Sequence, residues 1–264
     1  MNFNLPYLPE RTIKPRAYGI NMVMDKGLSL KEAENLVSVS SDITDFIKLG
    51  FGTSIITKDL EKKIEIYKSA NINVYLGGTL FEAYIVRNMF EDYLRLLDRL
   101  KIEVAEVSDG SIIMDHDVKC EYINKISKNR LVLSEVGSKE AGILISSGKW
   151  ISMMQKELQA GSYKVIAEAR ESGNVGIYRP SGKAHVSLVD KIRSKVDNEN
   201  IIWEAPLKSQ QVWFIKLIGA NVNLGNIPPN EVIPLETLRL GLRGDTFFNF
   251  VPSELLIHKQ KINK

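Results

Sequence analysis

Several features that often reveal the class of a protein are scarce in this chain. Its 264 residues include one cysteine, Cys120, so no internal disulfide can form and we expect a reducing, cytoplasmic setting. No apolar run approaches the roughly 20 residues that span a bilayer. Pro6, Pro9 and Pro15 interrupt the basic-then-apolar pattern of a signal peptide. We therefore expect a soluble protein without a membrane segment.

The chain also lacks a large excess of positive or negative charge. The net charge is +3, and no basic stripe of the kind that binds nucleic acid is visible, so we expect no nucleic-acid partner. The three histidines, His116, His185 and His258, fit neither zinc-site nor catalytic-triad spacing. No nucleophile–base pair suggests itself, which directs attention to charged side chains instead.

Short apolar segments alternate with helical patterns along most of the chain. Helical spacing occurs at 29–40, from Lys58 to about Ala70, at 85–100, and from Leu235 to Leu242. Eight segments read as strands: 17–24, 43–50, 72–78, 102–110, 130–139, 162–173, 200–209 and 220–227. Strands that alternate with helices predict βα units and a parallel sheet.

Eight such units predict the α/β fold of a (β/α)₈ TIM barrel in a single domain. We expect an extended arm at 1–16, the barrel at 17–250 and a tail at 251–264. The alternative is an open doubly wound sheet. No G-x-G-x-x-G follows any strand, which counts against the dinucleotide-binding form of that alternative.

Nearly every expected strand ends in charged residues. In a barrel these ends share one rim, where barrel enzymes keep their active sites. Four consecutive strands end with Glu106, Glu135, Glu168 and Glu204. A ring of carboxylates at one rim suits a hard divalent cation such as Mg²⁺. For any one glutamate, capping of a strand in a solvated rim is the alternative.

Basic residues alternate with these acids. They are Lys26, Lys48, Lys139, Arg170 and Lys208. Cations among metal-binding carboxylates suit a substrate that carries phosphate and carboxylate groups. Lys48 lies inside the apolar strand "FIKLG", where an unpaired ammonium would be costly, so a structural ion pair with Asp25 or a glutamate is the alternative. Ser209 and Gln210 begin the helix after the seventh strand, where barrels often bind phosphate.

The ordered motifs resemble the phosphosulfolactate synthase family from about Pro15 to Thr246. The blocks are "MDKGLS", "DFIKLGFGTS", "YLGGTLFE", "EVSDGSI", "SEVGSK", "EARESG", "EAPLKSQQVWFI", "NLGNI" and "ETLRLGLRGDT". The resemblance implies a barrel enzyme, a lyase that adds sulfite to phosphoenolpyruvate with Mg²⁺ to give 2-phospho-3-sulfolactate. In such enzymes the product enters coenzyme M biosynthesis or other sulfonate metabolism.

The resemblance also suggests roles for individual residues. Lys139 is the expected general acid, with Lys48 and Arg170 beside it in the catalytic set. The metal ligands are expected among Glu106, Glu135 and Glu168, with Asp109 a weaker candidate. The expected substrate-binding residues are Lys26, Lys208, Ser209, Gln210, Gly225 and Arg243.

One segment departs from the family pattern. After Lys139, "EAGILISSGKW" is shorter and more apolar than is usual there, which puts the conformation of this loop in doubt. Two other functions stay open: another phosphoenolpyruvate-using aldolase or mutase, and a non-catalytic, stress-related barrel like plant relatives that have lost much of the charged set. Apolar helix faces also lead us to expect a homo-oligomer.

Overall fold

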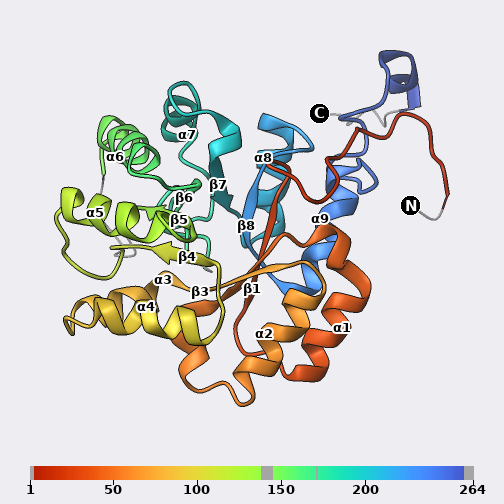
Figure 1. Ribbon diagram of the computed structural model, residues 1–264. Helices are drawn as coiled ribbons and strands as arrows, with labels where there is room; N and C mark the ends of the chain where they lie inside the picture. Colours follow the sequence, from red (N-terminus) through yellow and green to blue (C-terminus); the bar gives the residue numbers. More distant parts are fainter. Residues whose placement is uncertain (1–2, 138–144, 171, 259–264) are drawn as a thin grey trace.

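Parallel strands form the centre of the molecule (Figure 1). The computed structural model describes residues 3–137, 145–170 and 172–258. Within them lie eight strands: β1 (Asn21–Asp25), β2 (Phe46–Leu49), β3 (Asn73–Leu76), β4 (Val104–Val107), β5 (Leu131–Val136), β6 (Lys164–Ala167), β7 (Ile201–Glu204) and β8 (Leu224–Ile227). The eight segments that were predicted as strands contain these strands, apart from the last residue of β1.

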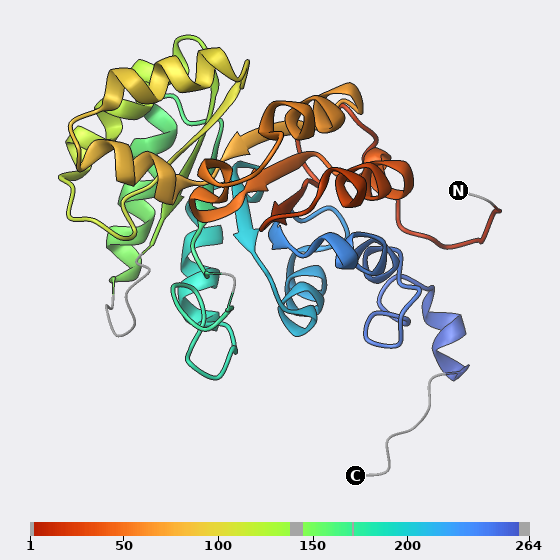
Figure 2. The ribbon, with the colours of Figure 1, turned by 90° about the horizontal axis from the view of Figure 1, so that it is seen from below.

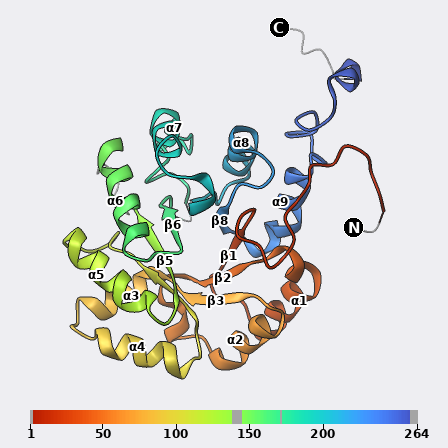
Figure 3. The same cartoon turned by 45° about the horizontal axis from the view of Figure 1, so that its top comes forward.

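Helices surround the strands as a ring (Figure 3). They are α1 (Leu30–Ser40), α2 (Leu60–Ser69), α3 (Gly78–Ile85), α4 (Phe90–Arg99), α5 (His116–Ser127), α6 (Ser147–Gln159), α7 (Val186–Arg193), α8 (Lys208–Ile218) and α9 (Val232–Arg239). Short 3₁₀ segments are η1 (Ser41–Ile43), η2 (Gly50–Ile55), η3 (Asn198–Asn200), η4 (Pro229–Glu231) and η5 (Ser253–His258). No helix in the described part of the chain is long and apolar enough to cross a membrane.

The helix predicted over 85–100 is wrong in its first part. Residue Asn88 has a left-handed backbone with φ 56°, and it separates α3 from α4. A left-handed residue cannot continue an α-helix. The apolar spacing is therefore shared between two helices. The closing helix α9 includes the first part of the segment predicted from Leu235 to Leu242, but it ends at Arg239, three residues earlier than predicted.

The strands form one sheet that closes almost completely. Its order is β3-β2-β1-β8-β7-β6-β5-β4, and the described pairings are parallel. Between the two edge strands, β3 and β4, no ladder is formed by the described residues. A cleft of about 280 Å³ lies at this seam, with Asn73 and Val104 in its wall. The predicted (β/α)₈ barrel is confirmed as a nearly closed one.

Alternation along each strand determines what lies inside the barrel. Successive side chains of a strand point to opposite faces. One set of faces packs on the helices, as Val23, Ile47 and Trp203 do. The other set forms a separate interior cluster: Ile20, Met22, Phe46, Tyr75, Val104, Leu133, Ile166 and Ile202. Two residues after members of this cluster, on the same inner face, come Lys48, Glu106, Glu135, Glu168 and Glu204.

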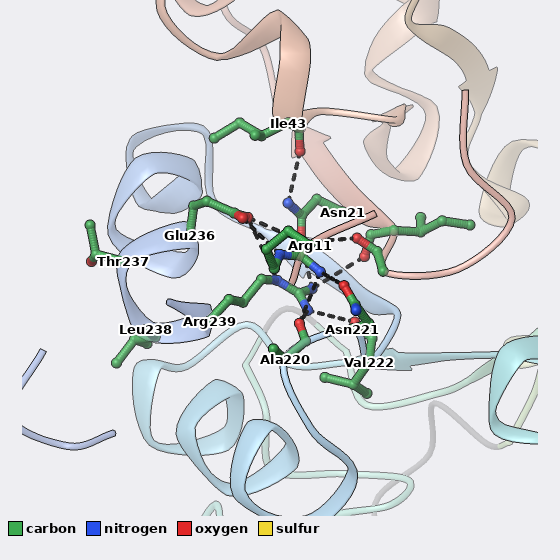
Figure 4. A network of polar contacts seen from close by, with 12 residues as sticks. Arg11, Asn21, Ile43, Ala220, Asn221, Val222, Glu236, Thr237, Leu238 and Arg239 are labelled. Atoms are coloured by element: carbon green, nitrogen blue, oxygen red, sulfur yellow. Dashed lines mark hydrogen bonds and ion pairs between the residues drawn. The ribbon is translucent and has the colours of Figure 1, made fainter. Parts of the chain in front are cut away.

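The N-terminal arm contacts the residues at the starts of β1 and β8, at the opposite end of the barrel, and Figure 4 shows this network of polar contacts. Arg11 donates to Glu236 on α9 at 2.7 and 3.2 Å, and to the carbonyl oxygen of Ala220 at 3.0 Å. The fully buried Arg239 donates to the same carbonyl at 2.6 Å and to Asn21 Oδ1 at 2.8 Å. The arm and the segment after α9 lie on the same side of the molecule (Figure 2). These contacts join the first and last parts of the chain.

Burial alone would raise the pKa of Glu236, but the hydrogen bond and charge of Arg11 outweigh it and hold this pKa below its ordinary value. Arg11→Met should therefore lower the free energy of unfolding by about 3 kcal/mol near pH 7. Because its folded-state pKa is depressed, ionised Glu236 stabilises the fold at pH values above its ordinary pKa. This stabilisation is lost as the pH falls through the folded-state pKa. The deficit of Arg11→Met should thus shrink on acidification, as measured by urea unfolding.

The matched control is Lys31→Met, because Lys31 pairs with Glu34 at 3.0 Å on the exposed face of α1. This variant should unfold like the wild type at each pH. A deficit of Arg11→Met that stays constant from pH 7 to pH 3 would contradict the predicted linkage.

Candidate active site

A cavity of about 250 Å³ opens at the carboxyl ends of the strands. Its charged lining residues are Lys48, Glu135, Glu168, Arg170 and Glu204. Its other lining residues are Met24, Phe51, Thr79, Ser111 and Asn226. Because β1, β2, β5, β6, β7 and β8 or the residues just after them contribute, the lining comes from most of the barrel. This is the end of the barrel at which barrel enzymes carry out their chemistry.

Lys48 is the buried cation in the cavity wall. Its Nζ lies 3.1 Å from Glu106 Oε2, 3.3 Å from Glu135 Oε2 and 3.5 Å from Glu204 Oε1. Its side chain is only 7% exposed. Burial acts to lower the pKa of Lys48, but the three carboxylates outweigh it and hold this pKa well above its ordinary value. The ammonium therefore stays protonated and holds three strands' carboxylates together.

Glu106 is held from its other side by the start of α3. The backbone N–H of Gly78 donates to Glu106 Oε1 at 2.6 Å. The positive end of a helix dipole favours a carboxylate at this position. A Cβ on Gly78 would collide with Glu106 Oε1 and with Ser108 Oγ. Residue 78 is therefore glycine because the carboxylate must approach the backbone closely.

Three carboxylates converge on the cavity and could hold a cation. One oxygen from each of Glu135, Glu168 and Glu204 lies within 4.8 Å of the other two, and all three side chains are buried. Burial, followed by repulsion from Glu135, raises the pKa of Glu204 to about 7, although Lys48 acts in the opposite direction. A bound cation would relieve this crowding, and carboxylate oxygens are the ligands that Mg²⁺ prefers. The donor set therefore fits a hard divalent cation.

A second layer of buried contacts positions these glutamates. Lys119 on α5 donates to the carbonyl oxygen of Glu135 at 2.6 Å and forms ion pairs with Asp109 at 2.8 Å and Glu157 at 2.9 Å. The hydroxyl of Tyr178 donates to the carbonyl oxygen of Glu204 at 2.8 Å. Fixing the backbone at each strand end limits the positions that the carboxylates can take.

Glu82 on α3 organises the loop that follows β4. This buried carboxylate accepts hydrogen bonds from the hydroxyl of Ser108 at 2.5 Å, and from the backbone N–H groups of Gly110 at 3.1 Å and Ser111 at 3.0 Å. One side chain thus fixes the loop conformation that places Ser111 in the cavity wall.

The structure brings part of the predicted site together. Lys48, Glu135, Glu168 and Arg170 line the cavity, and Glu106 contacts Lys48 without lining the cavity itself. Arg170 is exposed, has a left-handed backbone with φ 49°, and donates its N–H to Glu168 Oε1 at 2.7 Å. The predicted general acid, Lys139, lies outside the described residues.

The other predicted substrate-binding residues have different surroundings. Lys26 is exposed. Lys208 pairs with Asp245 at 2.5 Å. The amide of Gln210 donates to the carbonyl oxygens of Gly173 at 2.7 Å and Gly182 at 3.1 Å, so it anchors the loop after β6. Together with Ser209 it lines a separate outer cavity of about 560 Å³.

The remaining two differ from each other. Gly225 lies inside the barrel, where a Cβ would press on Met22 and Ile202. Arg243 follows α9, and its charge acts on Asp245 to lower the pKa of that carboxyl, behind the larger effects of Lys208. Neither residue is among the described residues that line the inner cavity.

Several lining residues escaped the sequence reasoning. Asn221 and Asn223 precede β8 and make other contacts: Asn221 accepts a hydrogen bond from Arg11 of the arm, and Asn223 donates to the carbonyl oxygen of Glu199 at 2.9 Å. The asparagine that reaches the cavity is Asn226. It belongs to the "NLGNI" block, so the block itself was the available signal.

Comparison with known proteins identifies the family of this chain. The family model described as (2R)-phospho-3-sulfolactate synthase (ComA) matches residues 9–245. Phosphosulfolactate synthase from Bacillus subtilis is 45% identical over 244 residues, which cover 91% of this chain and 97% of that protein. Phosphosulfolactate synthase from Methanothermobacter thermautotrophicus is 42% identical over 244 residues, covering 90% and 95% of the two chains. The chain belongs to the phosphosulfolactate synthase family.

Solved structures with low sequence identity share the fold. The 3-hexulose-6-phosphate synthase of Salmonella typhimurium superimposes with a TM-score of 0.56 at 13% identity, covering 85% of this chain and all of that one. A DHDPS structure from Cyanidioschyzon merolae gives 0.57 at 12% identity, covering 92% and 79%. These likenesses concern the barrel fold alone.

Removal of the central ammonium should destabilise the barrel. Lys48→Met leaves three buried carboxylates without their shared cation, so the free energy of unfolding should fall by about 3–5 kcal/mol at pH 8. Protonation of the crowded carboxylates should partly restore stability at pH 5. Urea unfolding at the two pH values measures both effects.

Lys62→Met is the control, because Lys62 is exposed and pairs only with Asp59 among the described residues. It should leave the unfolding curve unchanged. If Lys48→Met were as stable as this control at pH 8, Lys48 would not be the residue that holds the glutamates together.

Proposed function

We propose that this protein is a phosphosulfolactate synthase, a lyase that adds sulfite to phosphoenolpyruvate and yields (2R)-2-phospho-3-sulfolactate. The observation that carries the proposal is a cavity lined by Glu135, Glu168, Glu204 and Arg170, in a chain that matches the family over residues 9–245. Phosphoenolpyruvate has a carboxylate and a phosphate, so a site with cations and metal-binding carboxylates suits it.

The proposed reaction balances without a further reactant. The sulfur lone pair of sulfite forms a bond with the methylene carbon of phosphoenolpyruvate. The electrons of the carbon–carbon double bond move into the carboxylate, giving an enediolate-like intermediate. A proton is then delivered to the central carbon, the carboxylate re-forms, and the phosphate ester stays intact. The protein must therefore stabilise negative charge near the carboxylate and supply one proton.

Mg²⁺ is the proposed cofactor, with Glu135, Glu168 and Glu204 as its ligands. When bound, it would supply positive charge beside the substrate carboxylate. Glu204 replaces Glu106 in the ligand set expected from the sequence, because the carboxylate oxygens that converge within 4.8 Å of one another belong to Glu135, Glu168 and Glu204.

The basic residues have separate proposed tasks. Lys48 keeps the glutamates in place, and its raised pKa makes it a poor proton donor at neutral pH. Arg170, at the exposed edge of the cavity, would attract the anionic substrates. Lys139 keeps the role of general acid that the family resemblance gives it.

The proposal includes a cytoplasmic homo-oligomer that serves coenzyme M biosynthesis or other sulfonate metabolism. Exposed apolar side chains support self-association: Ile55 is 72% exposed and Ile56 is 83% exposed, close in the chain to the cavity residue Phe51. Apolar groups exposed together commonly mark a protein–protein interface.

Incubation with phosphoenolpyruvate, sulfite and Mg²⁺ should give a product whose mass equals the sum of the two substrates, with no release of inorganic phosphate. Mass spectrometry and a phosphate assay measure the two quantities. Consumption of phosphoenolpyruvate without sulfite would indicate an aldolase or mutase instead. A protein that consumes neither substrate and gives no binding heat with them would be a non-catalytic barrel.

Metal binding distinguishes the ligand set with Glu204 from the set with Glu106 that the sequence suggested. Glu204→Gln should weaken Mg²⁺ binding by at least about tenfold, because it removes one charged ligand. Glu106→Gln should weaken it by less, since Glu106 acts through Lys48. Isothermal titration with Mg²⁺ alone gives both affinities, and a larger loss in Glu106→Gln would restore Glu106 to the ligand set.

A further inference from the structure

Asn226 has an unusual position within β8. Opposite β8, strand β1 pairs Asn21 with Leu224 and Val23 with Ile227. Two steps along β1 therefore match three steps along β8. The extra residue is a β-bulge at Gly225 and Asn226. Bulges re-aim a side chain and are common next to active sites.

The backbone of Asn226 confirms the irregularity. It has φ 56°, in the left-handed region that asparagine tolerates better than most residues. Its N–H lies 3.3 Å from the sulfur of Met22. In a regular strand the residue after the inward-facing Gly225 would face the helices. The bulge instead places the side chain of Asn226 in the cavity wall.

The amide group of Asn226 is buried and incompletely satisfied. The residue is only 4% exposed, and no described residue donates a hydrogen bond to its Oδ1. The oxygen end of the amide is therefore enclosed within the protein. Because Oδ1 is inaccessible, Nδ2 is the polar end of the side chain that can face the cavity.

The chemistry around Asn226 favours an anionic oxygen as its partner. Glu135, Glu168 and Glu204 supply acceptors and cation ligands but no donors when ionised. The ammonium of Lys48 is already surrounded by carboxylates. Arg170 is exposed at the edge of the cavity, whereas Asn226 is buried in its wall. An anion beside Asn226 can therefore use a neutral donor, and an amide N–H group supplies one without attracting the glutamates as strongly as a cation would.

We propose that Asn226 is a substrate-binding residue whose amide donates a hydrogen bond to an oxygen of phosphoenolpyruvate. The inference rests on the proposed function and adds a residue to its substrate contacts. The bulge in β8 is the device that positions this residue, and the left-handed backbone explains why asparagine occupies it.

The decisive variant is Asn226→Gly. Glycine adopts the same left-handed backbone without strain, so the fold should be kept while the amide is lost. Binding of phosphoenolpyruvate in the presence of Mg²⁺, measured by isothermal titration, should weaken by about tenfold or more. The affinity for Mg²⁺ alone should stay within twofold of wild type. Asn226→Asp, which keeps the shape but replaces the donor with a carboxylate, should weaken phosphoenolpyruvate binding at least as much.

Asn88→Gly is the matched control. Asn88 has the same φ of 56° but lies exposed between α3 and α4, so its replacement should change neither affinity. Thermal unfolding of each variant checks that the fold is kept. If Asn226→Gly does not fold, Asn226→Asp decides the question by the same titration.

Each other outcome overturns the inference. Phosphoenolpyruvate affinity within twofold of wild type in both variants would show that Asn226 does not bind substrate. A parallel loss of affinity for Mg²⁺ alone in Asn226→Gly would make Asn226 a cation ligand instead. If the wild-type protein itself fails to bind phosphoenolpyruvate, the proposed function fails and this inference fails with it, which is distinguishable from failure in the variants alone.

Discussion

One buried ammonium group among three carboxylates is the interaction on which the barrel interior depends. An unpaired charge in this position would be prohibitively costly, and three unpaired carboxylates would be worse. Lys48 and the glutamates therefore require one another. The same mutual requirement keeps the barrel interior polar and open at the carboxyl ends of the strands. Nearer the beginnings of the strands, apolar side chains fill the interior. The cavity lies where charged side chains take the place of the close-packed apolar side chains found deeper in the barrel.

The scaffold around this layer limits its movement. Three strand ends in this layer are tied to neighbouring elements: Glu106 to the start of α3, Glu135 through its carbonyl to Lys119, and Glu204 through its carbonyl to Tyr178. These ties use buried polar groups with satisfied partners, which are strongest in a low-dielectric interior. Charged groups that would repel one another in a mobile loop are therefore held in a fixed arrangement that suits a divalent cation and an anionic substrate.

The sequence predicted the parts of the site that lie on strands. Lys48 and Glu135 follow a two-residue period, so their inward direction could be inferred once the strands were recognised. Lys208 and Gln210 lie beyond the strand end, where side-chain direction depends on loop contacts, and both are used to hold loops. Asn226 was missed for a related reason: a bulge adds one residue to β8 and reverses the face that simple alternation assigns.

The contact between the arm and α9 has a consequence for how this chain is made. Arg11 and Glu236 are 225 positions apart, and β1 pairs with β8. On the ribosome, the first strand therefore emerges long before its partner. One edge of β1 and the docking surface for the arm stay incomplete until almost the whole chain has been translated. Such long-range closure slows folding and exposes apolar edges in the meantime. Early translation products of this protein should therefore depend on chaperones.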